Sequence, residues 1–363
     1  MVKTTHHDVD LLSSIFRQRL LDWHRRVNNR QMPWKGIADP YKIWLSEIIL
    51  QQTRVDQGMA YYEKFVRHYP TILDLAAADD DQVFKHWEGL GYYSRCKNLL
   101  HTARVVADAY QGVFPSNYEQ ILALKGVGPY TAAAIAAFAF NLPYAVLDGN
   151  VFRVLSRVFA VWEPTDSTQG KTRFKELAGS TLSRQEPAAY NQAIMDFGAT
   201  VCTPQRPQCS SCPMGDICLA RLRAEVGSLP RKEKVLKKKN RFITWLILEI
   251  TSSGLIYLQK RPAGDIWENL HEYYPTESES RPEWTDDLVS GLVTDLLDVT
   301  PVSVKSLGAA TQQLTHQKIH GYFYLVHVDK RPAGLPAEGW VTKAAAQELA
   351  FPKLLKALNT TLL

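Results

Sequence analysis

The sequence predicts a mainly helical protein with a smaller α+β domain at its C-terminal end, and two observations support this prediction. Apolar residues recur at helical spacing along residues 1–230, and β-branched and aromatic residues become frequent beyond residue 241. The helical periodicity is clearest in five segments: Leu11–Leu20, Ile43–Gln51, Val83–Trp87, Leu99–Tyr110 and Thr131–Phe140. Pro, Gly and Asn residues fall between these segments, as expected for turns. A chain of 363 residues is long enough for two such domains.

The second domain is expected to follow a basic linker. Residues 231–241 are rich in lysine and arginine, so we expect an exposed segment there, and a solvated tether is favoured over one that also contacts phosphates. Residues 242–363 then form the predicted α+β domain. Its expected elements are strands at Phe242–Ile250, Gly254–Lys260 and Tyr322–Val328 and a helix at Asp286–Leu297.

Composition and charge limit the class of protein. Hydrophobic residues make up 45% of the chain and charged residues 22%, which is typical of a globular protein. The net charge of +5 and the pI of about 8.8 weakly favour a polyanionic partner. The first ten residues lack the apolar core of a secretory signal, and no apolar run is long enough to span a bilayer. We therefore expect a cytoplasmic protein with no membrane partner, and we expect it to be a monomer.

Four of the five cysteines lie close together and predict a metal site. The spacing is Cys202-x6-Cys209-x2-Cys212-x5-Cys218, and four thiolates in so short a segment can bind one metal ion or one iron–sulfur cluster. A tight cluster in a chain without a signal peptide favours a metal over disulfides. The spacing alone leaves zinc and iron–sulfur open. The fifth cysteine, Cys96, is expected to be a small packed residue.

A glycine-containing turn precedes an apolar helix and predicts a phosphate-binding hairpin. In Leu124-Lys-Gly-Val-Gly-Pro-Tyr-Thr131, Gly126 and Gly128 allow a tight turn and close approach of a ligand to the backbone. The next helix presents free N–H groups at its start, which suits phosphate, although an ordinary helical corner would look the same. Asp148 follows about twenty residues later. It can serve as a helix cap for Val151–Phe159 as well as a catalytic carboxylate.

Glu47 lies in an apolar run and is a candidate general acid. On a helix its neighbours are Ile43, Trp44, Leu50 and Gln51. A carboxyl group in such surroundings loses water, so we expect its pKa to rise toward neutrality. The alternative is a glutamate on a solvated helix face, which is the usual state of this residue type. The apolar neighbours favour the buried acid.

The hairpin and the residues after it resemble the helix–hairpin–helix DNA glycosylase superfamily. The resemblance rests on the L-x-G-V-G-x-x-T-A hairpin and on Val146-Leu-Asp-Gly-Asn-Val-Phe-Arg153, and the cysteine spacing matches the cluster loop of its endonuclease III-like members. It implies that Asp148 is the catalytic aspartate and that the four cysteines hold a [4Fe–4S] cluster. It also implies a catalytic domain over 1–230, with a six-helix region at about 31–140 and an iron–sulfur region at about 1–30 and 141–230.

Further motifs resemble the MutY family of adenine glycosylases. They are Trp44-Leu-Ser-Glu-Ile-Ile-Leu-Gln-Gln-Thr53, Leu90-Gly-Tyr-Tyr-Ser-Arg95 and Asn191-Gln-Ala-Ile-Met-Asp-Phe-Gly198. The resemblance implies a nucleoid-associated hydrolase that removes adenine paired with 8-oxoguanine or guanine in duplex DNA. Tyr130 occupies the position of the Schiff-base lysine of bifunctional relatives and cannot form an imine, so we expect a monofunctional enzyme. The alternatives are an endonuclease III-type glycosylase/lyase for oxidised pyrimidines and a non-catalytic DNA-binding module with a redox cluster.

The MutY resemblance also implies roles for individual residues. Glu47 would protonate the adenine, Asp148 would stabilise the cationic sugar, and Tyr130 would hydrogen-bond within this group. The residues expected to bind the extruded base are Met32, Trp34, Lys35 and Gln192, although Trp34 could be a packing residue. The residues expected to contact DNA around it are Gln52, Tyr92, Gly126, Gly128 and Asn150. In a structural view of the cluster, it would fix a loop whose Arg206, Arg221 and Arg223 face the DNA.

The C-terminal domain resembles the Nudix-like domain of the same family. The resemblance includes Arg261-Pro-Ala-Gly-Asp-Ile-Trp-Glu-Asn-Leu-His-Glu-Tyr-Tyr-Pro275. A working Nudix hydrolase needs the glutamate cluster R-E-x-x-E-E to bind Mg²⁺, and the helix expected at Asp286–Leu297 lacks it. We therefore expect a recognition domain. Leu314, Thr315 and His316 match the Phe-Ser-His segment that recognises 8-oxoguanine in the family, with leucine in place of the aromatic residue.

Overall fold

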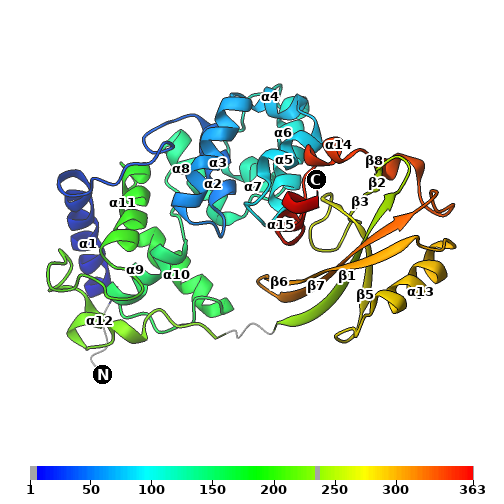
Figure 1. The fold of residues 1–363 in the computed structure, drawn as a ribbon. Helices are drawn as coiled ribbons and strands as arrows, with labels where there is room; N and C mark the ends of the chain where they lie inside the picture. The colour runs from blue at the N-terminus through cyan, green and yellow to red at the C-terminus, as the bar shows by residue number, and fades with distance from the viewer. Residues whose placement is uncertain (1–5, 234–237, 363) are drawn as a thin grey trace. The chain divides into compact units, whose positions relative to one another are not determined.

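The structure is a computed structural model that describes residues 6–233 and 238–362 (Figure 1). The chain divides into two compact units. The first unit contains the residues up to Ala77 and those from Asn98 to the linker, and the second contains Ala78–Lys97 and the C-terminal residues from 238 onward. Residues 234–237 of the expected linker lie outside the described residues, and so do residues 1–5 and 363.

Helices dominate the first unit, as the sequence predicts. They are α1 (His6–Arg26), α2 (Pro40–Leu50), α3 (Val55–His68), α4 (Ile72–Ala77), most of α6 (Ser94–Ala109), α7 (Tyr118–Ala123), α8 (Pro129–Phe140), α9 (Gly149–Val158), α10 (Thr168–Thr181), α11 (Pro187–Thr200) and α12 (Leu219–Leu222). The expected helices at 11–20, 43–51, 99–110 and 131–140 are confirmed. The short helix expected at 83–87 is α5 (Asp80–Trp87), which belongs to the second unit.

Helices α2 and α8 pack together and bring two distant parts of the chain to one place. Asp39 caps α2 by accepting hydrogen bonds from the Tyr41 and Lys42 backbone N–H groups, and Pro40 occupies the first turn, where its missing N–H costs nothing. Helix α8 starts the same way at Pro129 and is buried along residues 131–137. Its alanines allow close approach of α2, α7 and α11. The middle of α2 therefore faces the start of α8.

Helices α9 and α11 pack against each other and contact α1, α8, α10 and α12. Their shared core includes Phe16 and Leu20 of α1, Val154 of α9 and Phe197 of α11. Asn191 of α11 is fully buried, and its amide bonds the Tyr144 carbonyl at 2.8 Å and the Val146 N–H at 3.2 Å. This amide fixes the extended segment that leads into α9, and so it fixes where α9 begins.

The second unit contains a mixed β-sheet. The strand order is β6 (Ser303–Gln313), β7 (Gln317–Val328), β1 (Lys239–Ile250), β2 (Ile256–Tyr257) and β8 (Trp340–Val341), and β5 (Tyr274–Ser278) also pairs with β1. The long central strands β1 and β7 run parallel, and β6 pairs antiparallel with β7. A two-stranded ribbon is formed by β3 (Gln259–Lys260) and β4 (His271–Glu272). The strands predicted at Phe242–Ile250 and Tyr322–Val328 are confirmed, the one predicted at Gly254–Lys260 is divided into the short strands β2 and β3, and β6 was not predicted.

Helix α13 (Asp286–Leu297) has the bounds that the sequence predicts. Its Val289 and Val293 form a core with Leu246 and Leu248 of β1. Two short helices follow, α14 (Lys343–Gln347) and α15 (Lys353–Leu362). Strand β1 begins at Lys239, so the last residues of the expected linker are part of the sheet. Among the helices that the structure describes, none combines the length and apolarity needed to cross a membrane.

Candidate active site

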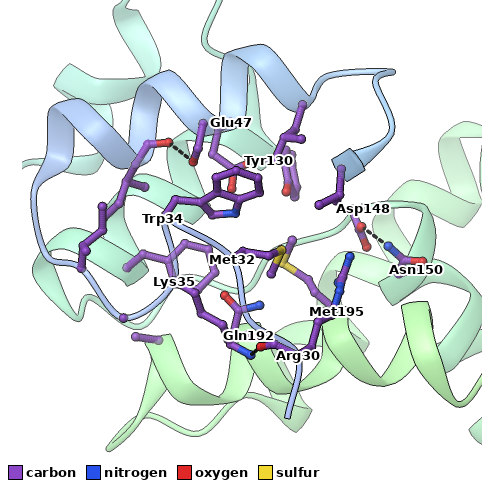
Figure 2. A pocket seen from close by; sticks show the side chains of 18 of the residues that line it. Arg30, Met32, Trp34, Lys35, Glu47, Tyr130, Asp148, Asn150, Gln192 and Met195 are labelled. Atoms are coloured by element: carbon purple, nitrogen blue, oxygen red, sulfur yellow. Dashed lines mark hydrogen bonds between the residues drawn. The ribbon is translucent and has the colours of Figure 1, made fainter. Parts of the chain in front are cut away.

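A cavity of about 800 Å³ lies in the first unit and gathers most of the predicted site residues. It is lined by the loop before α2, by α2, by the starts of α8 and α9, and by α11 (Figure 2). The predicted residues in its wall are Met32, Trp34, Lys35, Glu47, Gln52, Tyr130, Asp148, Asn150 and Gln192. The sequence positions of these residues span 160 residues, so the helix packing brings them together.

Glu47 is a buried acid in the wall of this cavity. It lies in the middle of α2 and is 7% exposed. Its pKa is raised to about 7, because burial and the nearby Asp148 raise it more than a hydrogen bond from Tyr130 lowers it. The rise agrees with the expectation from its apolar neighbours. At neutral pH the carboxyl group therefore exists in both protonation states.

Tyr130 lies in the first turn of α8, and its hydroxyl donates a hydrogen bond to the Glu47 carboxyl group. Burial and the two nearby carboxylates raise the pKa of the phenol well above its usual value. The side chain is therefore a neutral hydrogen-bond donor. It holds the orientation of Glu47 and faces the same cavity.

Asp148 is the residue that caps α9. One carboxylate oxygen accepts from the Val151 N–H at 2.7 Å, and the other accepts from the Asn150 amide at 2.8 Å. Burial raises its pKa, whereas these hydrogen bonds and the charge of Arg153 lower it. The capping role and a position in the cavity wall thus occur together, as the sequence allows.

Arg153 connects this carboxylate to the cysteine segment. Its guanidinium donates to the Asn150 side-chain oxygen at 2.7 Å and to the Cys202 carbonyl at 2.7 Å. Because Asn150 in turn bonds Asp148, a continuous hydrogen-bonded path runs from the cavity to the first cysteine. One turn later on α9, Arg157 donates to the Cys202 sulfur at 3.5 Å.

Among the residues expected to bind the base, Lys35 and Gln192 lie on the side of the cavity away from Glu47 and Tyr130, and Trp34 and Met32 lie between them (Figure 2). Trp34 lines the cavity and also packs edge-to-face on Tyr62, with ring centroids 5.1 Å apart, so it has a packing role, and its contact with a base stays a prediction. The Lys35 ammonium bonds the Arg30 carbonyl and Asp196, each at 2.7 Å. Asp196 has no place among the predicted site residues. The signal that could have found it is a charged residue inside the otherwise apolar run Ala193–Phe197.

The other residues predicted to contact DNA lie at the edge of this cavity or outside it. Gln52 is exposed at the edge of the cavity. Tyr92 belongs to the second unit, where its hydroxyl lies 2.7 Å from the Thr315 hydroxyl. Leu314, Thr315 and His316 form the turn between β6 and β7, and they line a cavity of about 600 Å³ together with Tyr92.

The two glycines of the hairpin occupy their positions for different local reasons. Gly126 has a φ of +80°, a left-handed conformation that favours glycine, and an added Cβ would lie 2.8 Å from the Asn98 Cβ. Gly128 caps α8 with an extended backbone, and an added Cβ would meet no atom within 4 Å. Nothing in the described chain fills the space beside Gly128, so a ligand can approach the backbone there. Lys125 is exposed between the helices.

The comparisons with known proteins agree with this geometry. Residues 45–178 match the HhH-GPD superfamily of base excision DNA repair proteins, and residues 245–360 match the NUDIX domain. The adenine DNA glycosylase of Buchnera aphidicola subsp. Baizongia pistaciae is 33% identical over 262 residues, which cover 70% of this chain and 72% of that protein. The chain belongs to the adenine DNA glycosylase family.

Other relatives place this family membership in context. The human adenine DNA glycosylase is 42% identical over 223 residues, which cover 59% of this chain and 41% of that protein. A thermostable thymine-DNA glycosylase has a TM-score of 0.55 and 30% identity, covering 59% of this chain and 98% of its own. A non-covalent endonuclease III–DNA complex has a TM-score of 0.51 and 20% identity over 58% of this chain and 97% of its own, which shows the shared fold.

Residues 202–218 match the iron–sulfur binding domain of endonuclease III, and they include the four clustered cysteines. Together with Arg157 these cysteines line one cavity, and none of them forms a disulfide. The Arg157 guanidinium and the Met214 N–H donate to the sulfurs of Cys202 and Cys212 at 3.5 and 3.4 Å, contacts that favour thiolates.

The match to an iron–sulfur binding domain favours a cluster over a single zinc ion at these cysteines. Burial raises the pKa of the free Cys212 thiol to about 11, so binding of the metal must displace its proton. The cofactor is a [4Fe–4S] cluster, and Cys202, Cys209, Cys212 and Cys218 would hold it. When bound, it cross-links the segment that Arg153 and Arg157 tie to α9.

Proposed function

We propose that this protein is a monofunctional adenine DNA glycosylase. It hydrolyses the N-glycosidic bond of adenine paired with 8-oxoguanine or guanine in duplex DNA. The observation that carries the proposal is the group formed by Glu47, Tyr130 and Asp148 in one cavity, in which a buried carboxyl has a pKa of about 7.

The two carboxyl groups divide the chemistry. Breaking the glycosidic bond leaves negative charge on the base and positive charge on the sugar. Glu47 in its protonated form gives its proton to the departing adenine, and Tyr130 keeps the carboxyl oriented. Asp148, held by Asn150 and the start of α9, stabilises the cationic sugar until water adds. Sugar hydrolases use the same pairing of an acid with a carboxylate.

The target base must leave the helix to reach these groups. Extrusion of a nucleotide costs a few kcal/mol and requires a pocket that receives the base. A cavity of about 800 Å³ is large enough for a purine, and Met32, Trp34, Lys35 and Gln192 form its wall. Gln52 at its exposed edge is suited to fill the space left in the duplex.

The cavity supports hydrolysis without strand cleavage. A lyase forms an imine between a lysine and the sugar, and this requires an uncharged amine. The position that carries this lysine in bifunctional relatives is Tyr130. The lysine that does line the cavity, Lys35, is an ammonium bound to Asp196 at 2.7 Å. The protein therefore releases the base and leaves the strand intact.

We assign recognition of the base that pairs with the target adenine to the second unit. The hydroxyls of Tyr92 and Thr315 lie 2.7 Å apart at the edge of an open cavity, and His316 is exposed beside them. Such a group can bond the extra oxygen and N–H that distinguish 8-oxoguanine from guanine. The helix α13 lacks clustered glutamates, so the Nudix-like fold serves binding and not nucleotide hydrolysis. The hairpin that contains Gly126 and Gly128 contacts the DNA, and so does Asn150. The protein works as a monomer.

One assay tests the activity and its closest alternative. The purified protein, with its cluster, is incubated with a duplex containing adenine opposite 8-oxoguanine, and the products are separated with and without alkali. We expect adenine release and a strand break that appears only after alkali. A break without alkali on a duplex containing thymine glycol would instead indicate an endonuclease III-type lyase. Binding without release of any base would contradict both enzymatic functions.

A further inference from the structure

A single buried carboxylate lies behind the base-binding wall of the cavity. Asp196, on α11, is fully buried, yet the proposed reaction does not use it. Burial of a charged group is costly unless it is paired and hydrogen-bonded. All the side chains that bond the Asp196 carboxylate come from one segment of the chain, more than 160 residues away in sequence.

Three side chains from residues 28–35 donate to this carboxylate. Arg30 donates to one oxygen at 3.0 Å, and Lys35 and Asn28 donate to the other at 2.7 and 2.8 Å. Lys35 also bonds the Arg30 carbonyl at 2.7 Å, which closes the segment into a loop. Residues 28–39 contain no helix or strand, and apart from a turn bond between the Lys35 N–H and the Met32 carbonyl, these side-chain bonds tie the segment to α11.

The loop held by Asp196 carries the base-binding residues. Met32 and Trp34 lie between Arg30 and Lys35 in the sequence, and both line the cavity. In Figure 2, Arg30, Lys35 and Gln192 lie at the side of the cavity away from Glu47 and Tyr130, with Met32 and Trp34 between. A shift of this loop would therefore move the base relative to the acid.

The charge balance makes Asp196 the anion of this group. His24 lies against Asn28 at 3.0 Å, and burial together with the charge of Lys35 lowers its pKa, so it is neutral near pH 7. Two cations, Arg30 and Lys35, thus share one carboxylate. Without it they would repel each other in a partly desolvated wall.

We infer that Asp196 is a positioning residue for adenine excision: through Lys35 and Arg30 it fixes the loop that holds the extruded base against Glu47. It touches neither the base nor the sugar. The inference rests on the proposed function, because it concerns the geometry of that reaction. Displacement of a reacting group by about 1 Å can cost about 10²-fold in rate, so a buried tether at this point has a measurable effect.

A double-mutant cycle on the cluster-containing protein tests it. Excision of adenine opposite 8-oxoguanine is measured under single turnover for the wild type, Asp196→Asn, Lys35→Met and the double variant. We expect Asp196→Asn to lower the rate constant by about 10²-fold. If Asp196 acts through Lys35, the rate constant of the double variant should lie within about threefold of that of the slower single variant.

The matched control is Glu186→Gln. Glu186 directly precedes the same helix α11 and pairs with Arg25 of α1 at 2.6 Å, but its side chain is 45% exposed and lies outside the cavity. Its variant should keep the wild-type rate constant. A purely structural role of Asp196 would lower the amplitude of the reaction, which reports the folded fraction, and leave the rate constant of that fraction unchanged.

The outcomes separate the two proposals. If the wild type releases no adenine, the proposed function is wrong. If the wild type is active and Asp196→Asn keeps its rate constant, or if the two single losses multiply in the double variant, the positioning role is wrong. If Asp196→Asn does not fold, Asn28→Ala is tested instead. It removes one donor to the Asp196 carboxylate oxygen that also binds Lys35 and should slow excision about threefold. An unchanged rate constant in Asn28→Ala would then overturn the inference.

Discussion

Two buried glutamates, one in each unit, have opposite surroundings. Glu47 in the first unit is 7% exposed and Glu272 in the second is fully buried, and burial raises the pKa of both. Glu272 accepts from Arg261 at 2.5 Å and from the Trp245 indole at 2.8 Å. The groups that shift the pKa of Glu47 are Tyr130 and Asp148, and neither is a cation.

The difference shows how a buried carboxyl becomes available for chemistry. A cation beside Glu272 stabilises its charge, and the surrounding strands fill the space around it. Glu47 has a neutral donor on one side, a second carboxyl nearby and a cavity in front of it. Such a group can change protonation state near pH 7 and can reach a substrate. Glu272 contributes to the fold, whereas Glu47 is placed to act on a ligand.

The largest effect is expected from removing the acid. Glu47→Gln keeps the size of the side chain but has no proton to give, so the single-turnover rate of adenine excision should fall by about 10³-fold. Affinity for the uncleaved duplex should stay within a few-fold of the wild type. Glu63→Gln, on the exposed face of α3, is the control and should be fully active. Retained excision by Glu47→Gln would remove the basis for the contrast with Glu272.

The reverse result is expected for the structural glutamate. Glu272→Gln leaves the buried Arg261 with one carboxylate partner, Asp265, and should lower the free energy of unfolding by about 3 kcal/mol, near the lower end for breaking a buried pair. Chemical denaturation measures this change. The control, Glu277→Gln, removes an exposed partner of Arg241 and should cost less than about 1 kcal/mol. The excision rate constant of the folded fraction should not change, and a loss comparable to that of Glu47→Gln would break the comparison.

The two hairpin glycines repeat the contrast on a smaller scale. Gly126 has positive φ and packs against Asn98, so Gly126→Ala should destabilise the protein by about 1–2 kcal/mol. Gly128 faces open space, so Gly128→Ala should leave stability unchanged but weaken DNA binding about tenfold by blocking a backbone–phosphate contact. Thermal unfolding and a DNA titration measure the two effects. Equal destabilisation by both variants would contradict the assignment.

Much of the fold could be predicted from the sequence, because the helices of the core have strong apolar periodicity. The bounds of α13 follow from Thr285 as its cap and from the spacing of Val289 and Val293. Strand β6 escaped prediction because Ser303–Gln313 is rich in small and polar residues. It is an exposed strand at the end of the sheet and pairs with β7 alone, so it needs few apolar residues. Its pairing partner, not its composition, makes it a strand.

The site shows the same limit. The setting of Glu47 could be predicted because its apolar neighbours lie within one turn of the same helix. The hydrogen bond from Tyr130 was expected only from the family resemblance, and the partners of Asp196 were not predicted at all, because each contact joins residues of different helices or loops that are distant in sequence. Local patterns therefore predict the burial of a side chain, whereas its partners emerge only from the packing of α2, α8 and α11.

The smallest expected effect concerns the donor to Glu47. Burial raises the pKa of Glu47, and the Tyr130 hydroxyl opposes this rise by stabilising the ionised carboxylate, with a resulting pKa of about 7. Tyr130→Phe removes the donor, so the pKa of Glu47 should rise further. In the proposed mechanism Glu47 acts in its protonated form, so excision should decline with increasing pH through the pKa of Glu47, and in the variant this decline should move to higher pH. A lost hydrogen bond of about 0.5–1.5 kcal/mol corresponds to a shift of about half to one pH unit.

Single-turnover rates between pH 5 and 9 measure the shift of this alkaline limb. Tyr118→Phe is the control, because Tyr118 stacks on Tyr144 outside the cavity and should leave the limb in place. Below the limb, where Glu47 is protonated in both proteins, Tyr130→Phe should lose only the few-fold rate that orientation of the acid contributes. A limb that stays in place or moves to lower pH would mean that the phenol does not act on Glu47. The availability of this carboxyl would then have to come from burial and Asp148 alone.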